Sequence, residues 1–356
     1  MSPRKASRAA GDFSEIKQPV SLKFLAEYLG LSPATVSLVM NRAPGAKAIS
    51  EPTKARIHAA ARKFNYRANL VARSLRTRSS FTIGVLVPEI SEGYAAMVMS
   101  GIEDRLLESG YFYFVASHRH QPDLIDEYPQ MFLDRAVDGL IAVDTPVTHP
   151  LPVPVVAVSG HHDAKGVTNI VLNHRRGASL VLDHLYKLGH RRIAFIKGQK
   201  FSSDTTVRWN ALREGCAGLG LSSELVVQLE GDRPSPEPGY IAAKRLLQMA
   251  QPFTALVAFN DVSAIGAISA LREAGLHIPR DVSVVGFDDI QAAAFQNPGL
   301  TTVRQPLRKM GEAAADTLIA RINDPKANAR RTMVEPELVI RESTAPVLAV
   351  AAGGSV

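Results

Sequence analysis

Cysteine is almost absent from this sequence, which has one, Cys216, among its 356 residues. A single cysteine cannot form an internal disulfide or a zinc site built on several thiolates, so disulfide-stapled secreted scaffolds are excluded. Long apolar runs are also lacking: none approaches the roughly 18 residues of a membrane-spanning helix. The basic opening, residues 1–12, is not followed by the apolar stretch of a secretory signal. The sequence therefore predicts a cytoplasmic protein with no membrane partner.

Catalytic motifs are missing as well. The sequence contains no G-x-S-x-G, H-E-x-x-H, G-x-x-x-x-G-K-[ST] or G-x-G-x-x-G motif, so it offers no recognisable nucleophile elbow, zinc-protease helix or phosphate loop. The neighbouring His161 and His162 suggest a metal site, but no carboxylate cluster shares their spacing, and neutral or surface histidine is the usual state. We therefore expect a protein that is not an enzyme and that uses neither a cofactor nor a metal.

Charge is divided unevenly along the chain. The first 80 residues carry 15 lysines and arginines against 4 acidic residues, whereas the remainder carries 26 against 30. A strongly basic segment joined to a mildly acidic body is typical of a polyanion-binding module attached to a domain with another role. A solvated basic tail is the alternative, and only the pattern of the segment decides between the two.

The basic segment has the pattern of three short helices. Residues 1–19 are polar and lack periodicity, which predicts a flexible arm. From Val20 onward, apolar residues recur at three- to four-residue spacing. Gly30 suits the left-handed turn that ends a helix, and Ser32–Pro33 suits the start of the next as a hydroxyl N-cap followed by proline. These signals predict helices over 22–29, over 34–40 and from 50 onward.

Two helices separated by so short a turn predict a helix-turn-helix, which we place in a headpiece of residues 20–66. In its second helix, Val36 and Val39 are expected to face the small core. The outward surface then consists of small and hydroxyl side chains, which reach phosphates and base edges in a major groove, and of an alanine and a leucine, which suit a thymine methyl. A plain three-helix packing unit is the alternative. The outward residues are Ala34, Thr35, Ser37 and Leu38.

Beyond Ser80 the sequence alternates β-rich apolar runs with amphipathic stretches. The run 82–87 predicts a strand, 94–109 predicts a helix, and the alternation continues to a strand at 283–287. Strands that alternate with helices predict an α/β fold of parallel sheets covered by helices, here in two lobes. Ligands of such folds bind outside the carboxyl ends of the strands, so the expected site is the cleft between the lobes.

Ordered segments along almost the whole chain resemble one family. The segments VSLKFLAEYLGLSPATVSLVMN at 20–41 and FNYRANLVARSLR at 64–76 resemble the headpiece and hinge of the LacI/GalR family of bacterial transcription regulators. The resemblance continues with TIGVLVPEIS at Thr82, AFNDVSAIGAISALREAGLHIPRDVSVVGFDD at Ala258 and LTTVRQP at Leu300.

This resemblance implies a periplasmic-binding-protein-like body in which the chain crosses between the lobes three times. We place the crossings near Ser159, Thr302 and Asn328, with helix 307–322 in the first lobe and strand 333–341 in the second. The expected domains are a basic arm (1–19), the headpiece (20–66), a hinge (67–80), a body (81–346) with a first lobe (81–158 and 303–327) and a second lobe (159–302 and 328–346), and a tail (347–356).

The resemblance also implies a site for a small-molecule effector, a sugar or sugar derivative, with nucleosides as the alternative. Arg208 lies where the family places an arginine that clasps the effector, and its planar fork suits paired hydroxyls or a carboxylate. Asp261, at the end of the strand 255–259, could bind the effector, but it is at least as well suited to capping the helix that follows it. The only tryptophan, Trp209, suits stacking on a pyranose ring, although core packing is the favoured interpretation. The effector-binding residues implied are Tyr94, Ser159, Arg208, Asn260 and Asp288.

The DNA-binding residues follow from the headpiece and from the same resemblance. Segment 69–75 would form a hinge helix that inserts Leu75 into a central base step of the minor groove. Leu38 stands where relatives often carry an arginine that reads guanine, and Ser159 where many carry an effector-binding aspartate, so neither operator nor effector can be copied from a relative. The expected DNA-binding residues are Ser32, Ala34, Thr35, Ser37, Leu38, Asn41, Tyr66, Asn69 and Leu75.

Taken together, these patterns predict a ligand-responsive, sequence-specific DNA-binding regulator, in the favoured interpretation a repressor, that binds a near-palindromic double-stranded operator as a homodimer. The tail after Ser343 has no leucine heptads, so we expect a dimer and not a tetramer. A sugar-modifying α/β enzyme with a basic N-terminal tail is one alternative, but it lacks a recognisable catalytic group. A solute-binding protein is the other, and it should carry an export signal and no helix-turn-helix.

Overall fold

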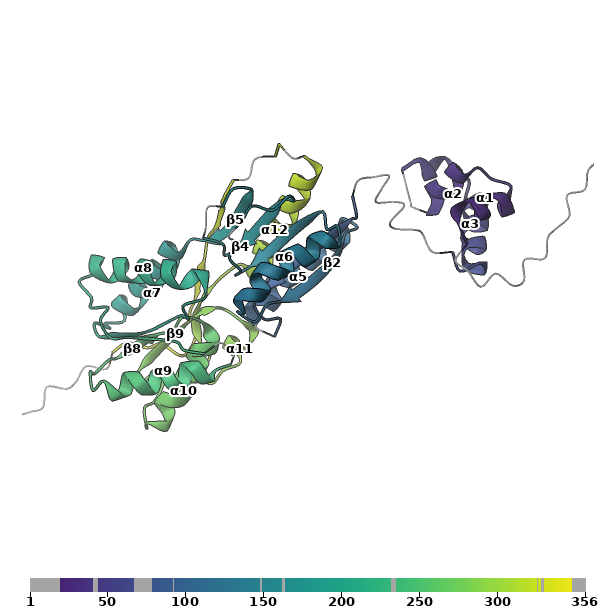
Figure 1. The fold of residues 1–356 in the computed structure, drawn as a ribbon. Helices are drawn as coiled ribbons and strands as arrows, with labels where there is room; N and C mark the ends of the chain where they lie inside the picture. The colour runs from purple at the N-terminus through teal and green to yellow at the C-terminus, as the bar shows by residue number, and fades with distance from the viewer. Residues whose placement is uncertain are drawn as a thin grey trace, which may run out of the picture. The chain divides into compact units, whose positions relative to one another are not determined.

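The chain separates into two units, Met1–Ser80 and Phe81–Val356, which are described one at a time. The computed structural model (Figure 1) describes residues 20–40, 44–66, 79–91, 93–147, 149–161, 164–231, 235–324, 326–327 and 330–347. The arm, most of the hinge, and the predicted DNA-binding residues Asn41, Asn69 and Leu75 lie outside these ranges.

The headpiece is helical, and local signals set the ends of its helices. The Ser21 hydroxyl accepts the N–H of Phe24 at the start of α1, and Gly30 closes that helix with a φ of 66°. Ser32 Oγ accepts the N–H of Thr35 at 3.1 Å, so the predicted serine cap of α2 is confirmed. The elements are α1 (Leu22–Leu29), α2 (Pro33–Met40), the 3₁₀ turn η1 (Pro44–Ala48), which was not predicted, and α3 (Glu51–Lys63).

One small apolar cluster joins the three headpiece helices. Leu25, Val36 and Ile57, one from each helix, are completely buried, and Val39 is buried beside them. The expectation that Val36 and Val39 face the core is therefore confirmed. Because Val36 and Val39 occupy the inner side of α2 and Met40 packs against the same cluster, the remaining residues of this helix form its outer side.

The first sheet of the body is wholly parallel. Its strands lie in the order β11-β5-β4-β3-β1-β2, and β3 and β4 are buried along their entire lengths, as expected of parallel strands covered on both faces. These strands are β1 (Thr82–Val87), β2 (Phe112–Ser117), β3 (Gly139–Val143), β4 (Val155–Val158), β5 (Val167–Leu172) and β11 (Thr332–Val334).

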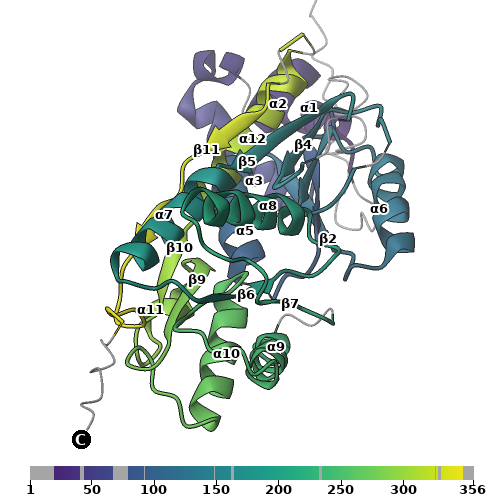
Figure 2. The same cartoon turned by 90° about the vertical axis from the view of Figure 1, so that its left-hand side faces the viewer.

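The second sheet repeats this plan with one exception. Its order is β12-β10-β9-β8-β6-β7, and only the edge strand β12 runs antiparallel to its neighbour. Figure 2 shows β10 beside β9 in this sheet and β11 beside β5 in the first. The strands are β6 (Ile193–Lys197), β7 (Val226–Gln228), β8 (Ala255–Val257), β9 (Ser283–Asp288), β10 (Thr301–Arg304) and β12 (Glu337–Val339).

Helices cover both sheets. Helix α12 packs on α5 so closely that a Cβ on Gly101 would meet the carbonyl oxygen of Arg308, and one on Gly311 would meet that of Val98. None of the described helices combines the length and apolarity needed to cross a bilayer. The body helices are α5 (Gly93–Glu108), α6 (Pro122–Asp134), α7 (His174–Lys187), α8 (Ser203–Gly218), α9 (Glu237–Gln248), α10 (Asp261–Glu273), α11 (Gln291–Ala294) and α12 (Leu307–Asn323).

The crossings between the lobes differ from those expected. Strand β5 pairs with β4 in the first sheet, so the first crossing follows Leu172 and does not lie near Ser159. Strand β10 keeps Val303 and Arg304 in the second sheet, which moves the next crossing beyond Thr302.

The expected strand 333–341 is in fact two strands, β11 in the first sheet and β12 in the second. The third crossing therefore falls between Val334 and Glu337, and not near Asn328. Short apolar runs of similar composition form strands in both sheets, so only the observed strand pairing reveals to which sheet each run belongs.

The described part of the chain end, from Ser343 onward, packs against the body and is not a free tail. Ser343 is completely buried, and its hydroxyl donates to the carbonyl of Val284 at 2.6 Å and accepts the N–H of Thr301 at 2.8 Å. The N–H of Val347 donates to the carbonyl of Leu188 at 2.9 Å. Residues 343–347 are thus part of the second lobe.

Candidate functional site

The outer surface of α2 presents small and hydroxyl side chains. Ala34 is exposed, whereas Thr35 and Ser37 are half-buried. Besides capping the helix, the Ser32 hydroxyl lies 2.9 Å from that of Thr35. Since its oxygen already accepts a backbone N–H, Ser32 orients both the helix start and the Thr35 side chain.

Two other predicted DNA-binding residues lie in the described headpiece. Leu38 is half-buried, and a Cβ added to Gly45 in η1 would stand 3.2 Å from its Cδ2 atom, so the turn covers part of this side chain. Tyr66 follows α3, packs on the headpiece core, and donates its N–H to the carbonyl of Ala61 at 2.8 Å. Burial raises the pKa of the Tyr66 phenol, which keeps it a neutral donor.

A cavity of about 130 Å³ lies in the body between its two lobes. It opens beside the carboxyl ends of strands in both sheets, the position expected for an α/β ligand site. Tyr94, Arg208, Asn260 and Asp288 line it, whereas Ser159 does not. The first lobe supplies Ser91, Gly93, Tyr94, His120 and Asp144, and the second supplies Gln199, Phe201, Ser202, Asp204, Arg208, Leu229, Ser235, Pro238, Phe259, Asn260, Val262, Ser263, Asp288 and Ile290.

Arg208, in the second turn of α8, is the fixed cation of the cavity. Only 4% of the residue is exposed, and its guanidinium carbon lies 3.7 Å from the ring centre of Phe287 and 4.4 Å from that of Phe259. One terminal nitrogen donates to Asp204 Oδ2 at 3.1 Å and the other to the carbonyl of Phe259 at 2.5 Å. Stacking and hydrogen bonding hold the fork in one orientation, while its buried Nε has no partner among the described residues.

Two carboxyl groups line the same cavity from strand ends. Asp288 ends β9 with a φ of 109° and accepts a hydrogen bond from Gln305 Nε2 at 2.6 Å. Asp144, after β3, has a φ of 39° and accepts the N–H of Ser203 at 3.2 Å. Burial raises the pKa of both to about 7; for Asp144 the nearby charge of Asp204 adds to the effect. Strained backbone and shifted pKa values together mark this edge as a functional site.

Asn260 has a structural role as well as a place in the cavity wall. It is the N-cap of α10: its Oδ1 accepts the N–H of Ser263 at 2.9 Å, and the Ser263 hydroxyl accepts the Asn260 N–H at 3.2 Å. The cap proposed for Asp261 is therefore wrong, because the residue before it takes that position. Asp261 is completely buried and accepts from the Thr302 hydroxyl at 2.6 Å and the Ile290 N–H at 2.9 Å.

Ser159 lies behind the cavity wall. Its hydroxyl is 2.6 Å from that of Tyr94, and its carbonyl accepts a hydrogen bond from the Ser203 hydroxyl. Ser159 thus connects the first lobe to the start of α8 and positions Tyr94. Trp209, in contrast, packs in the core edge-to-face on Phe195 at 5.6 Å, which confirms the core interpretation.

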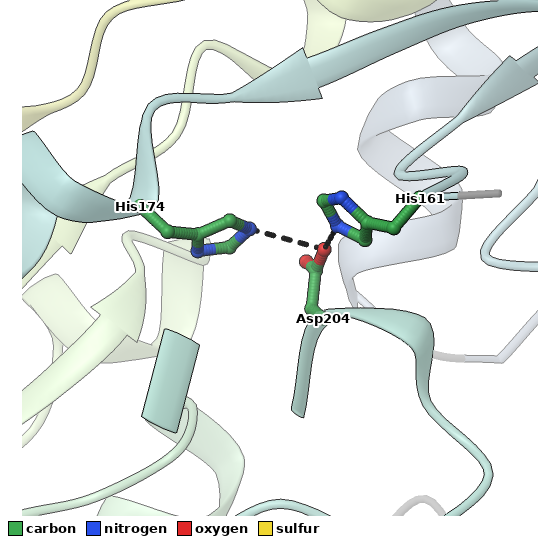
Figure 3. A group of neighbouring side chains, drawn as sticks. All are labelled: His161, His174 and Asp204. Atoms are coloured by element: carbon green, nitrogen blue, oxygen red, sulfur yellow. Dashed lines mark hydrogen bonds and ion pairs between the residues drawn. The ribbon is translucent and has the colours of Figure 1, made fainter. Parts of the chain in front are cut away.

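Asp204 forms hydrogen bonds with several polar side chains next to the cavity (Figure 3). Its Oδ1 lies 2.6 Å from His161 Nε2 and 3.1 Å from His174 Nε2, and its Oδ2 accepts from Arg208. Burial opposes ionisation of Asp204, but the two imidazoles and the guanidinium hold its pKa well below its usual range. Burial lowers the pKa of His174, so that ring is neutral and donates Nε2–H.

From the sequence, only His161 of this cluster was a candidate for a metal site, and it was paired with His162 and not with His174 or Asp204. The members of the cluster stand at 161, 174 and 204, separations that match no metal or catalytic spacing. The one available signal was position, because His174 and Asp204 each follow a loop at the start of a helix, where polar residues of α/β folds meet ligands.

Comparison with known proteins identifies the family to which this chain belongs. Residues 21–69 match the family described as "Bacterial regulatory proteins, lacI family", and residues 182–344 match a periplasmic binding protein-like domain. The HTH-type transcriptional repressor PurR of Haemophilus influenzae is 31% identical over 340 residues, covering 92% of this chain and 99% of that protein. The chain belongs to the LacI family.

Solved structures of LacI-family members have the same fold. The Lac repressor dimer bound to operator and the anti-inducer ONPF is 27% identical, with a TM-score of 0.81 over 92% of this chain and 100% of that one. A LacI family regulator from Enterococcus faecium with bound ribose is 27% identical, with a TM-score of 0.67 over 75% of this chain and 99% of that one.

Membership in the LacI family establishes the class of function. The chain is a ligand-responsive DNA-binding transcription regulator and not an enzyme. The predicted fold, a helix-turn-helix headpiece joined to a two-lobed α/β body, is confirmed.

Proposed function

We propose that this LacI-family chain is a homodimeric repressor of the cytoplasm that binds a near-palindromic operator and is controlled by a neutral sugar or sugar derivative. The observation that carries the proposal is the cavity between the lobes, which is lined by the buried Arg208 and by the carboxyl groups of Asp144, Asp204 and Asp288. The sugar-bound Enterococcus faecium regulator supports the same ligand class.

The polar groups of the cavity favour a ligand rich in hydroxyls. Asp144 and Asp288 accept hydroxyl hydrogens, the Arg208 fork donates, and the rings of Phe201 and Phe259 offer apolar contact. Asp204 stays ionised beside Arg208, whereas the pKa of Asp144 and of Asp288 is raised to about 7, so these two groups can donate as well as accept hydrogen bonds to neutral hydroxyls. The cavity volume of about 130 Å³ is below the roughly 300–1,000 Å³ of sites for drug-sized molecules, which favours a small sugar.

The headpiece would enter the major groove with α2. Ala34, Thr35, Ser37 and Leu38 are the proposed base- and phosphate-contacting residues, because they form the side of α2 that the core leaves outward. Ser32 and Tyr66 would support them from the ends of the helices. The hinge segment with Asn69 and Leu75, and Asn41 after α2, complete the proposed contacts.

A dimer contact is supported by apolar residues on the first lobe. Strand β2 is an edge strand, and its Phe112 and Phe114 are 62% and 38% exposed although they pack edge-to-face at 5.3 Å. Phe112→Glu should convert the dimer to a monomer in light scattering. Phe295→Glu, at an even more exposed phenylalanine of the second lobe, is the matched control and should leave the dimer intact. A stable tetramer of the wild type would contradict the proposal.

One two-stage experiment tests the proposed function. Selection from random DNA should yield a near-palindromic operator, and thermal-shift screening should then find a sugar that stabilises the body and changes operator affinity. A nucleoside that stabilises the protein where no sugar does would overturn the ligand class. Failure to select any sequence would overturn operator binding.

A further inference from the structure

Three metal-binding side chains converge beside the cavity from separate segments of the chain. His161 follows β4 of the first sheet, His174 begins α7, and Asp204 lies in the first turn of α8. One ligand atom of each lies within 4.8 Å of the other two. Figure 3 shows both imidazole rings directing Nε2 toward the same carboxylate oxygen.

We propose that His161, His174 and Asp204 bind a divalent transition-metal ion of the Zn²⁺ type. Imidazole nitrogen and carboxylate oxygen are ligands that zinc favours, and three protein ligands leave a fourth position open. In tetrahedral coordination with bonds of about 2.0–2.1 Å, two ligand atoms stand about 3.3 Å apart. The two N–O separations of 2.6 and 3.1 Å would have to widen to that value, and the two Nε2 atoms, which lie within 4.8 Å of each other, would have to approach to it, so binding requires small rotations of both rings.

The hydrogen bonds that now hold the cluster leave its rings incompletely satisfied. Side chains of His161 and His174 are 9% and 1% exposed, and each Nδ1 is buried without a hydrogen-bond partner among the described residues. A buried polar atom without a partner costs free energy, because it loses its hydrogen bonds to water. Metal coordination through Nε2 would place each ring proton on Nδ1, so the metal-bound form adds two metal–nitrogen bonds and requires an acceptor, such as a water, beside each Nδ1.

Acidic groups lie near the cluster. Asp204 and Asp288 are buried, Asp144 is half-buried, and all three line the cavity, where Arg208 is the one guanidinium among the described lining residues. A bound cation would favour the ionised forms of Asp144 and Asp288, whose pKa values are raised to about 7. Arg208 also bonds the second oxygen of Asp204 at 3.1 Å, which leaves Oδ1 for the metal and fixes its direction.

A metal at this site would be held by residues of both lobes. His161 lies between two strands of the first sheet, whereas α7 and α8 pack in the apolar core of the second. A bound ion would therefore tie the lobes together, and, because Asp204 lines the cavity, its open position would be near a bound effector. Metal binding itself does not depend on the proposed repressor function.

The test is a competition titration of untagged, chelator-treated full-length protein with Zn²⁺ and a chromophoric chelator. One tight site per chain is expected. His161→Ala and His174→Ala should each weaken it by more than about 100-fold, since loss of an outer-shell partner alone costs 10–100-fold. His149→Ala removes an exposed histidine of the same body and should change nothing.

A second measurement needs no variant. X-ray absorption at the zinc edge of the wild-type complex should report two imidazole nitrogens and at least one oxygen at about 2.0–2.1 Å. Binding that survives both cluster substitutions, a shell with one or no imidazole, or no tight site in the wild type would overturn the proposal, and none of these results concerns operator binding.

Discussion

The surface of α2 and the cavity of the body are built in opposite ways. On α2 the side chains are small, solvated and held by neighbours three residues away, as Ser32 holds Thr35. In the cavity Arg208 is buried and Asp144 is half-buried, and each is held in part by a residue far away in the sequence, Arg208 by Phe259 at 51 positions and Asp144 by Ser203 at 59. A DNA surface gains from remaining hydrated and adaptable, whereas a small ligand needs groups already desolvated and fixed.

The largest effect is expected when the headpiece is removed from the body. A chain lacking residues 1–80 should lose operator binding, because that segment carries the net positive charge and the helix-turn-helix. Electrophoretic shift with the selected operator should detect no complex, while the wild type should lose affinity steeply with salt as counterions are released. Effector-induced thermal stabilisation should persist in the shortened chain. Retained operator binding would show that the body contacts DNA.

The next effect concerns the buried carboxylates of the cavity. Because the pKa of Asp288 rises from an unfolded value near 3.8 to about 7, its folded form binds the proton more tightly, and its contribution to stability is lost as pH rises through this interval. Asp288→Asn keeps an acceptor for Gln305 without the charge. The free energy of unfolding of this variant, relative to wild type, should therefore improve between about pH 4 and pH 7, by on the order of 1.4 kcal/mol per pKa unit.

Only the difference in unfolding free energy between Asp288→Asn and the wild type reports on Asp288, because another group titrates over the same pH range. Burial lowers the pKa of His118 to about 4, and this makes the wild-type protein more stable as pH rises over much of the same range. Urea denaturation of both proteins at each pH gives the comparison. Parallel profiles would mean that Asp288 is ionised throughout and that its charge is compensated.

Ligand binding should respond to the same groups more moderately. Asp288→Ala and Arg208→Ala each remove charged hydrogen bonds worth about 1.5–3 kcal/mol, so effector affinity should fall roughly 10- to 150-fold while operator affinity is nearly kept. Arg213→Ala, at an exposed arginine on the same helix, is the control. Calorimetry that gave unchanged affinity for both cavity variants would place the effector elsewhere.

The same contrast explains what the sequence could predict. Helix ends in the headpiece were correct because their signals, Gly30 and Ser32–Pro33, act on adjacent residues. Sheet membership was partly wrong because β5, β11 and β12 are short strands whose partners lie far away in the sequence.

The cavity shows a similar division. Tyr94, Arg208, Asn260 and Asp288 came from a family pattern and line the cavity. The cluster around Asp204 could not be predicted because folding alone brings its residues together: Asp204 lies 30 positions from His174 and 43 from His161. The sequence neighbour of His161 is His162, whereas Asp204 and His174 lie in two later helices.

The smallest effect tests the local character of the headpiece. Ser32→Ala removes the cap of α2, which should cost about 1 kcal/mol and speed amide exchange at Thr35 about fivefold in the full-length chain. Ser50→Ala is a closely matched control. Ser50 precedes α3 and its hydroxyl also lies 2.9 Å from a threonine hydroxyl, that of Thr53, but it makes no cap hydrogen bond to the backbone. Exchange at the start of α3 should therefore change less. Equal acceleration in both variants would assign the stabilisation to the serine–threonine hydroxyl pair, and the backbone cap would lose its role in positioning α2.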